Sequence, residues 1–306
     1  MLFAYICAMK KFFPIAYVLL VVLGLIWGSS FILIKRGLLT FSPVEVASLR
    51  LFIAGLALLP IFIINLPKSK RKNYGWFFLS GLIGNGLPAI LFSVAQTHLS
   101  SSVTGALNSL TPMFALIVGV VVYRLPFDRS KILGVVIGLC GALALILLGN
   151  RSEFRGDLAY ASLVILAALF YGINVNLIKE KFALSKPMVI AAFPIVFMAI
   201  PSFFYLLMAG TFQSMSFEGQ ALESIGAMAI LAVIGTALSL VLFNHLIQIT
   251  NAVFASLTTY IIPIVALMWG VLDGESLSAF QVGGMGLILL GVVLVRKKRI
   301  TRLITS

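Results

Sequence analysis

Charged side chains are scarce in this chain of 306 residues. Only 10% of the residues are charged, whereas 61% are hydrophobic. Soluble domains have about a quarter charged residues, so this composition excludes the soluble globular class. We therefore expect an integral membrane protein.

Acidic side chains are missing from the middle of the apolar runs. All nine Asp and Glu residues fall in loops or near the ends of those runs. An ionisable group inside a membrane is the usual proton carrier of a pump or transporter. The sequence therefore excludes proton exchange built on a carboxylate at the membrane midplane.

Cysteine is also rare, with Cys7 and Cys140 far apart along the chain. Two distant cysteines exclude a disulfide framework and a cysteine metal site. The apolar runs also contain no paired carboxylates, no histidine cluster and no Ser/Lys pair. We therefore expect neither a metal, nor a cofactor, nor enzymatic activity.

Long apolar runs are what the chain has instead. A helix that crosses the hydrocarbon core needs about 20 apolar residues, and ten segments approach or reach that length. The segments are 12–34, 43–66, 75–97, 101–123, 131–149, 157–178, 187–209, 223–248, 252–271 and 277–295. The sequence therefore predicts an all-α integral membrane protein with ten transmembrane helices and short connections.

Basic residues outnumber acidic ones, and the formal net charge is +13. In the ten-helix arrangement most Lys and Arg residues fall on one side, as cytoplasmic loops require. This topology accounts for the charge without a nucleic-acid partner. It predicts that both termini are cytoplasmic, that residues 296–306 form a basic cytoplasmic tail, and that the protein lies in the plasma (inner) membrane.

The second half of the sequence repeats the first. Residues 24–28 align with 168–172 at an offset of 144, and Pro112 aligns with Pro263 at an offset of 151. We expect one repeat over 12–149 and a second over 157–295. Because each has five spans, the second enters the membrane in the opposite sense, as in carriers that alternate their access.

Several short motifs occur in a familiar order. They are Trp27-Gly28-Ser29-Ser30-Phe31, Ser48-Leu49-Arg50, Asn108 with Pro112, Tyr171-Gly172, Pro263, and Gly274-Glu275-Ser276-Leu277, followed by Gln281, Gly284 and Gly291. In these motifs the chain resembles the drug/metabolite transporter superfamily, in its ten-helix EamA-type branch. One departure is Tyr123-Arg124-Leu125-Pro126, where the family usually repeats the acidic loop. The resemblance implies a secondary carrier or facilitator of small metabolites, often amino acids, and often directed outward.

Polar residues within the spans are the candidate cavity lining. Trp27 and Ser30 lie three residues apart and share a helix face, as do their repeat mates Tyr171 and Asn174. Each half thus contributes one aromatic and one hydrogen-bonding group. The alternative is that Trp27 and Tyr171 are packing aromatics.

Two prolines create a second set of candidates. Pro112 follows Asn108 and Thr111, and Pro263 follows Thr259 and Tyr260. A proline leaves a carbonyl one turn upstream without its helical partner. Such a carbonyl either binds substrate or is satisfied by the neighbouring Asn and Thr side chains. Asn85 and Asn244 are further candidates for the cavity.

Arg50 and His245 are the ionisable residues inside the spans. Arg50 lies seven residues past Pro43, or about 10 Å down its helix. It either binds a substrate carboxylate or ties its helix to carbonyls of a neighbour. His245 is either a proton-coupling group or a packing residue.

These expectations define one function and one alternative. A neutral cavity rich in Asn, Ser, Thr, Trp and Tyr suits amino acids and related zwitterionic or amphiphilic solutes. The partners are a small-molecule substrate and the lipid bilayer, with a homodimer face on 131–149 and 277–295 as an open option. The alternative function is a flippase for lipids or lipid-linked sugars.

Overall fold

Every regular element that the structure describes is a helix. The computed structural model describes residues 2–69, 71–124, 129–147, 154–249, 255, 258–275 and 278–296. The helices are α1 (Leu2–Gly37), α2 (Pro43–Asn65), η1 (Leu66–Lys68), η2 (Arg71–Asn73), α3 (Tyr74–Gly81), η3 (Leu82–Gly86), α4 (Leu87–Ala95), α5 (Ser101–Asn108), α6 (Thr111–Val121), α7 (Arg129–Leu147), α8 (Phe154–Lys181), α9 (Pro187–Met208), α10 (Thr211–Ser214), α11 (Gly219–Ala232), η4 (Val233–Leu238), α12 (Ser239–Ile249), α14 (Thr258–Leu272) and α15 (Ala279–Arg296).

Seven helical segments in the described ranges are long and apolar enough to cross a membrane. They are Ile15–Gly37, Pro43–Asn65, Arg71–Ala95, Ser101–Val121, Leu158–Lys181, Pro187–Met208 and Gly219–Ile247. Three shorter apolar helices, Leu133–Ala142, Ile261–Leu272 and Val282–Gly291, lie in the remaining predicted spans. Large apolar side chains such as Val18, Ile64 and Leu166 are exposed on the outside of the bundle, where lipid takes the place of water. The expectation of a multi-pass membrane protein is confirmed.

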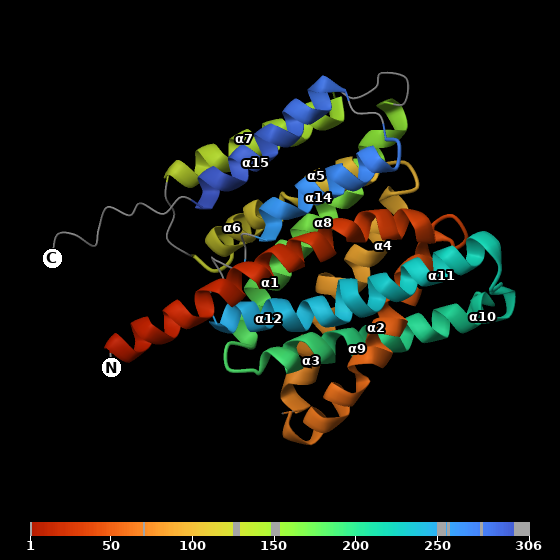
Figure 1. Ribbon diagram of the computed structural model, residues 1–306, viewed down its shortest axis with the longest axis horizontal. Helices are drawn as coiled ribbons and strands as arrows, with labels where there is room; N and C mark the ends of the chain where they lie inside the picture. Colours follow the sequence, from red (N-terminus) through yellow and green to blue (C-terminus); the bar gives the residue numbers. More distant parts are fainter. Residues whose placement is uncertain are drawn as a thin grey trace.

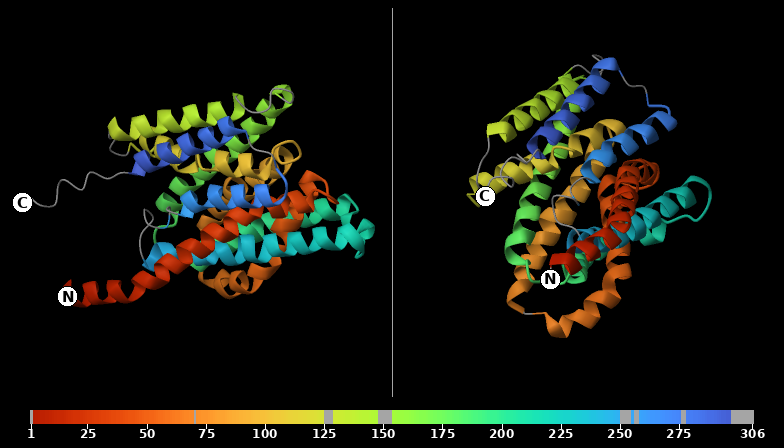
Figure 2. Two further views of the ribbon diagram at one scale, coloured as in Figure 1. Left: turned by 45° about the horizontal axis from the view of Figure 1, so that its top comes forward. Right: turned by 60° about the vertical axis from the view of Figure 1, so that its left-hand side comes forward.

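The helices lie side by side in one bundle (Figure 1). The helices α7 and α15 form a pair along one edge, and α2, α3 and α9 lie toward the opposite side in both figures (Figure 2). Between these groups lie α1, α8 and α14. The helix α1 packs on α14, α11 and α12, while α8 packs on α3, α4, α5 and α6. The middle of the bundle is therefore built around α1 and α8.

Glycines let α7 and α15 approach closely. A methyl group built on Gly141 would lie 2.8 Å from the carbonyl oxygen of Gly284. One built on Gly291 would lie 2.5 Å from the carbonyl oxygen of Gly134 and from the amide nitrogen of Gly138. Small residues allow this contact between backbones in membranes. A homodimer through α7 and α15 stays a prediction. Within the chain, the glycines of these two helices already pack against each other.

Two of the predicted spans contain a π-helical turn at their centre. The first span runs through α3, η3 and α4, and the second through α11, η4 and α12. A π turn displaces a carbonyl from its usual partner. In η4 the Thr236 hydroxyl donates to the Leu231 carbonyl, five residues earlier, at 3.0 Å. The sequence predicted continuous helices here.

A third predicted span, 101–123, is interrupted at Ser109 and Leu110, between α5 and α6. Pro112 lies in the first turn of α6. The Thr111 hydroxyl donates to the Asn108 carbonyl at 2.8 Å. Of the two alternatives for this carbonyl, the structure has the one in which a neighbouring side chain satisfies it. Pro263, in contrast, lies within the continuous helix α14.

We expect Gly291→Ala to destabilise the α7–α15 pair. Its methyl group would meet the backbone of α7, and overpacking of this kind costs about 1–3 kcal/mol. The free energy or midpoint of thermal unfolding in detergent measures the effect. The matched control is Gly286→Ala on the same helix, where an added methyl group has no neighbour within 4 Å. Equal midpoints for the two variants would contradict the packing role of Gly291.

Candidate functional site

Trp27 of α1 is held by the second half of the chain. Its indole Nε1 donates a hydrogen bond to Ser239 Oγ at 2.9 Å. Its ring centroid lies 4.9 Å from that of Phe243. Ser239 in turn donates its own proton to the Gly235 carbonyl at 2.7 Å. The indole is therefore anchored at the C-terminal end of η4 and the start of α12.

Ser30 lies one turn further along α1, as predicted from its spacing. It is buried and donates to the Ile26 carbonyl of its own helix at 3.2 Å. A methyl group added at Gly235 would lie 3.3 Å from Ser30 Oγ. Gly235 thus lets α1 pack directly against η4.

Arg50 of α2 reaches the same π turn. Its Nε donates to Thr236 Oγ1 at 2.8 Å. Thr236 has already given its proton to the Leu231 carbonyl, so its oxygen is free to accept. Thr236 and Ser239 are three residues apart and therefore neighbours on the helix surface. They bring Arg50 and Trp27 to one stretch of chain.

Tyr171 of α8 completes the central polar site, defined here as Trp27, Arg50, Tyr171, Thr236 and Ser239. The Tyr171 phenol lies within electrostatic reach of the Arg50 guanidinium. The Tyr171 ring stacks on Phe92 of α4, with centroids 5.9 Å apart. Aromatic and polar groups from both halves thus meet near η4.

Asn174, the fourth of the residues predicted from the repeat, lies at the other π turn. It is buried, and its Oδ1 accepts a hydrogen bond from Ser80 Oγ at 2.7 Å. A methyl group added at Gly84 of η3 would collide with its amide. The structure therefore separates the predicted quartet between η4 and η3.

The other predicted residues have varied surroundings. Asn244 bonds within its own helix, to the Leu240 carbonyl at 2.8 Å. Asn85 lies in η3, partly buried, and its side chain makes no hydrogen bond with any residue the structure describes. His245 is exposed on α12, and Thr259 is partly buried in α14. The Tyr260 side chain lies outside the described residues.

Four polar residues at the π turns and on α8 were missed by the sequence analysis. They are Ser80, Thr236, Ser239 and Asn176, whose amide donates to the Ala115 and Gly172 carbonyls at 2.9 Å. Serine and threonine are common in transmembrane helices, where they usually bond to their own backbone. The spacing of three between Thr236 and Ser239 was the available signal.

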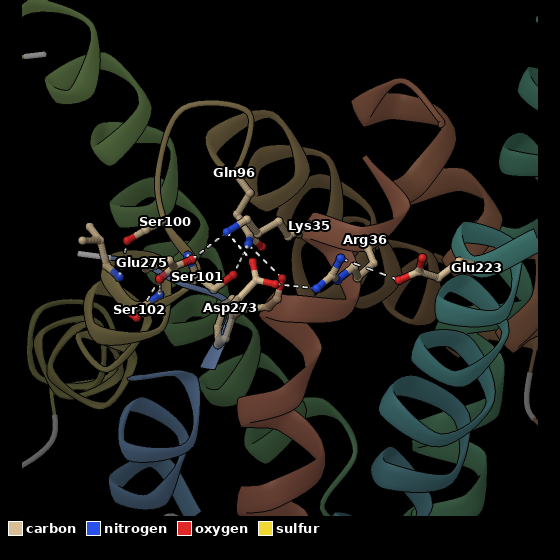
Figure 3. Close-up of polar contacts among 11 residues, drawn as sticks. Lys35, Arg36, Gln96, Ser100, Ser101, Ser102, Glu223, Asp273 and Glu275 are labelled. Carbon is tan, nitrogen blue, oxygen red and sulfur yellow. Dashed lines mark hydrogen bonds and ion pairs between the residues drawn. The ribbon is translucent and has the colours of Figure 1, made fainter. Parts of the chain in front are cut away.

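Ion pairs join several helices at one end of the bundle (Figure 3). The outer ion cluster, named for the side of the membrane on which we expect it, comprises Lys35, Arg36, Glu223, Asp273 and Glu275. Lys35 Nζ lies 2.7 Å from Asp273 Oδ2 and 3.2 Å from Glu275 Oε1. Arg36 pairs with Asp273, and more distantly with Glu223 at 3.6 Å. The cluster ties α1 to α11 and to the loop after α14.

Glu275 also caps a helix. Its carboxylate accepts hydrogen bonds from the Ser101 and Ser102 amides at 2.9 and 3.2 Å, and from the Ser102 hydroxyl at 2.8 Å. A negative charge is favourable at the N-terminus of a helix such as α5. Gly274, with a φ of 81°, makes the turn that directs Glu275 toward α5.

The pKa of Glu275 reflects these contacts. Burial opposes ionisation of the carboxyl, but hydrogen bonds from Ser101, Ser102 and Lys35 outweigh burial and hold the pKa below its ordinary value. Glu275 is therefore charged throughout the neutral range. The sequence did not predict the pairing of the members of the outer ion cluster.

A weaker polar contact lies between the ends of α6 and α8. The Tyr123 phenol hydrogen-bonds to the Glu180 carboxylate, and burial together with this carboxylate raises the pKa of Tyr123. Glu180 also pairs with Lys181 at 2.6 Å. This contact corresponds along the repeat to the outer ion cluster, because Glu180 aligns with Arg36 at the offset of 144.

Known proteins with similar sequences are transporters. The model of the EamA-like transporter family matches residues 14–147 and 158–297. An uncharacterized transporter of Archaeoglobus fulgidus is 27% identical, over 89% of this chain and 95% of its own. The uncharacterized inner membrane transporter YedA of Escherichia coli K12 is 23% identical, over 89% and 88%. The uncharacterized transporter YyaM of Bacillus subtilis is 26% identical, over 90% and 92%.

A solved crystal structure is similar in fold. It superposes on 92% of this chain and 96% of its own with a TM-score of 0.62. Its sequence is 15% identical, so the likeness concerns the arrangement of the helices alone.

We expect Glu275→Gln to weaken the outer ion cluster. The variant loses the charge that Lys35 and the α5 amides contact, and charged hydrogen bonds contribute about 1.5–3 kcal/mol each. Thermal unfolding at pH 7 measures the loss. Glu218→Gln is the matched control, because Glu218 is exposed and lies in no ion pair among the described residues. An equal loss in both variants would contradict the role of Glu275.

The difference between wild type and Glu275→Gln should depend on pH. The folded pKa of Glu275 is lowered, so its stabilising contribution is complete above the unfolded value of about 4.3. The contribution disappears as the pH falls through the lower, folded value. Unfolding midpoints of both proteins from pH 7 to pH 3 test this. A difference already lost at pH 6 would point to another group.

Proposed function

Because the chain belongs to the EamA-like transporter family, we propose that it is a secondary carrier or facilitator of small metabolites. Its substrates are amino acids or related zwitterionic and amphiphilic compounds, exported across the plasma membrane. Transport proceeds by alternating access between two inverted repeats, with ten spans and both termini in the cytoplasm. The inner-membrane location of the relative YedA supports this placement.

Matched helix contacts support the inverted repeats. The pairs α7–α15 and α2–α9 each join an element to its own repeat mate. The pair α1–α14 has its mate in α8–α6, α2–α4 in α9–α12, and α3–α9 in α11–α2. Such a pattern is the one a pseudo-twofold axis produces. In an inverted repeat this axis lies in the membrane plane.

Individual close contacts are matched as well. Each contact joins a residue that has its repeat mate at an offset of 144 to a residue that has its mate at an offset of 151. Gly28 and Gly172 are mates at 144, and Phe114 and Val265 are mates at 151. The matched contacts are Gly28 on Val265 with Gly172 on Phe114, and Ser30 on Gly235 with Asn174 on Gly84. On α2 and α9, Gly55 meets Ala199, its own mate at 144. The axis therefore passes near this crossing.

The observation on which the proposal chiefly rests is the pair of π turns. η3 begins at Leu82 and η4 at Val233, an offset of 151. Both lie where polar groups of α1, α2 and α8 converge. Irregular backbone at membrane depth is tolerated where it is buried in protein or lines a cavity. We assign the substrate path to the region between η3 and η4.

The two ends of the bundle suit alternating gates. The outer ion cluster closes the end that we assign to the outside, and it must separate before substrate leaves outward. At the cytoplasmic end, the Tyr123–Glu180 contact is a single hydrogen bond between α6 and α8. The outer ion cluster thus contains more interactions than the contact between Tyr123 and Glu180. Because the outer end is held more firmly, this conformation favours access from the cytoplasm.

An apolar pocket favours the flippase as the second candidate. It has a volume of about 180 Å³ and lies between α2, α10 and α11. Its lining includes Leu49 and Ile53, which flank Arg50 in sequence. An acyl chain would fit such a lining while a polar headgroup lay at the central polar site. Headgroup-dependent scrambling of labelled lipids in liposomes would distinguish a flippase from a carrier of soluble solutes.

Counterflow of a labelled amino-acid panel into proteoliposomes tests the carrier. We expect Trp27→Phe to lower saturable flux about tenfold, because it loses one buried hydrogen bond of about 1–1.5 kcal/mol. Trp269→Phe is the matched control, because Trp269 donates the same kind of bond to Ser29 on an exposed face. An equal loss of flux in Trp27→Phe and Trp269→Phe would indicate that Trp27 is a packing residue. No amino-acid flux in the wild type would refute the substrate class.

Flux should not depend on an imposed pH gradient. The described spans have no carboxylate near the Gly55–Ala199 crossing, and Glu45 lies near the outer end of α2, bonded to Thr211 and Ser42. The same counterflow assay with and without a gradient of one pH unit provides the measurement. Accumulation driven by the gradient would instead identify a proton-coupled carrier, and His245→Gln would then be the first variant to compare.

A further inference from the structure

We propose that Arg50 is an anion-binding residue of the transport site, and that the transported solutes present a carboxylate to it. This inference rests on the proposed carrier function and narrows its substrate class. Of the two roles that the sequence left open for Arg50, it selects substrate binding. The helix tie to Thr236 then serves to orient the guanidinium.

The guanidinium uses little of its hydrogen-bonding capacity. Arginine has five N–H donors. Within the described residues, Arg50 makes one hydrogen bond, from Nε to Thr236. The four N–H groups on its two terminal nitrogens have no protein acceptor there. These are the groups that form a fork matching a carboxylate.

The terminal nitrogens are also reachable. In the part of the chain that the structure describes, Gln96 Oε1 is the one fully buried side-chain polar atom without a partner. The Arg50 terminal nitrogens lack partners and yet are not fully buried. They therefore keep some surface that a ligand can reach.

The positive charge of Arg50 has no counterion among the residues that the structure describes. None of the ion pairs among the described residues includes Arg50. Glu45, on the same helix, is bonded to Thr211 Oγ1 at 2.6 Å and to the Ser42 amide at 2.9 Å. A charge of this kind is costly near the helix centre. An incoming anion would recover part of that cost.

Its depth is suited to a substrate site. Arg50 lies five residues from Gly55, or about 7.5 Å from the crossing of α2 and α9. This distance is well inside the half-thickness of the hydrocarbon core, about 15 Å. Lys35 and Arg36, in contrast, lie at the helix end and are neutralised by carboxylates.

The neighbouring residues suggest how the remainder of a solute is accommodated. The Trp27 and Phe243 rings lie beside Ser239, three residues from Thr236. Tyr171 supplies a phenol near the guanidinium. No acidic group among the described residues faces this position to attract an amine. The site therefore selects for a carboxylate and tolerates an aromatic or apolar substituent.

The test compares ligands that share a phenyl ring but differ in charge. The probes are L-phenylalanine, 3-phenylpropionate and L-phenylalaninamide, added to purified full-length protein at constant ionic strength. The readout is the rise in thermal midpoint that accompanies binding. We expect both carboxylates to stabilise the wild type and the amide to have no effect.

Variants at two positions assign the effect to Arg50. Arg50→Gln should weaken carboxylate binding about ten- to hundredfold, the range for a lost charge-assisted contact. Arg50→Lys should retain part of it. Thr236→Val keeps the charge of Arg50 but removes the residue that orients its guanidinium. The carboxylate affinity of this variant should lie between those of the wild type and Arg50→Gln. Arg71→Gln, an exposed arginine, is the control.

Several results would overturn the proposal. They are equal stabilisation by phenylalanine and its amide, undiminished carboxylate binding in Arg50→Gln, and no shift with either carboxylate in the wild type. Displacement of 3-phenylpropionate by phosphatidylglycerol in mixed micelles would assign the guanidinium to a lipid phosphate instead. Carboxylate binding without counterflow would refute the carrier function but leave the anion site at Arg50. Equal flux of the acid and the amide would support the carrier function but refute the anion site.

Discussion

The hydroxyl groups of Thr236 and Ser239 both donate and accept hydrogen bonds, and the central polar site depends on them. Each hydroxyl donates its proton within its own helix, to Leu231 and Gly235 respectively. Each then accepts from a partner on another helix, Arg50 or Trp27. In hydrocarbon an unsatisfied polar group is costly, so a displaced carbonyl and an unpaired side chain must both find partners. The π turn at η4 meets both requirements.

The charges at the outer end of the bundle have partners of opposite sign, whereas the charge of Arg50 has none among the described residues. At the outer end, Lys35 and Arg36 meet Asp273 and Glu275, and the helix end of α5 adds amide donors. Such a network holds these helices together. Arg50 has no such partners among the described residues. Paired charges stabilise one conformation of the protein. An unpaired positive charge within the bundle instead binds an anion that can reach it.

Much of this arrangement follows from the sequence, but the decisive contacts do not. The spacing of three residues predicted that Trp27 and Ser30 share a face, and both meet η4. The π turns themselves were not predicted, because they differ from an α-helix by one residue per turn and have no composition of their own. The pairing of Glu275 with Lys35 depends on the backbone turn at Gly274, which periodicity does not report.

In the carrier that we propose, the matching parts of the two repeats form the frame, and the parts that differ set its selectivity. Position 194, the mate of Arg50, is a proline, so the second repeat has no corresponding cation. Asn85 occupies in η3 the position of Thr236 in η4, and it has no described partner. A symmetric frame with a cation on one side and a neutral amide on the other presents unlike groups to a bound solute. A molecule with one charged end and one neutral end would bind in a single orientation, and both gates would then act on the same bound pose.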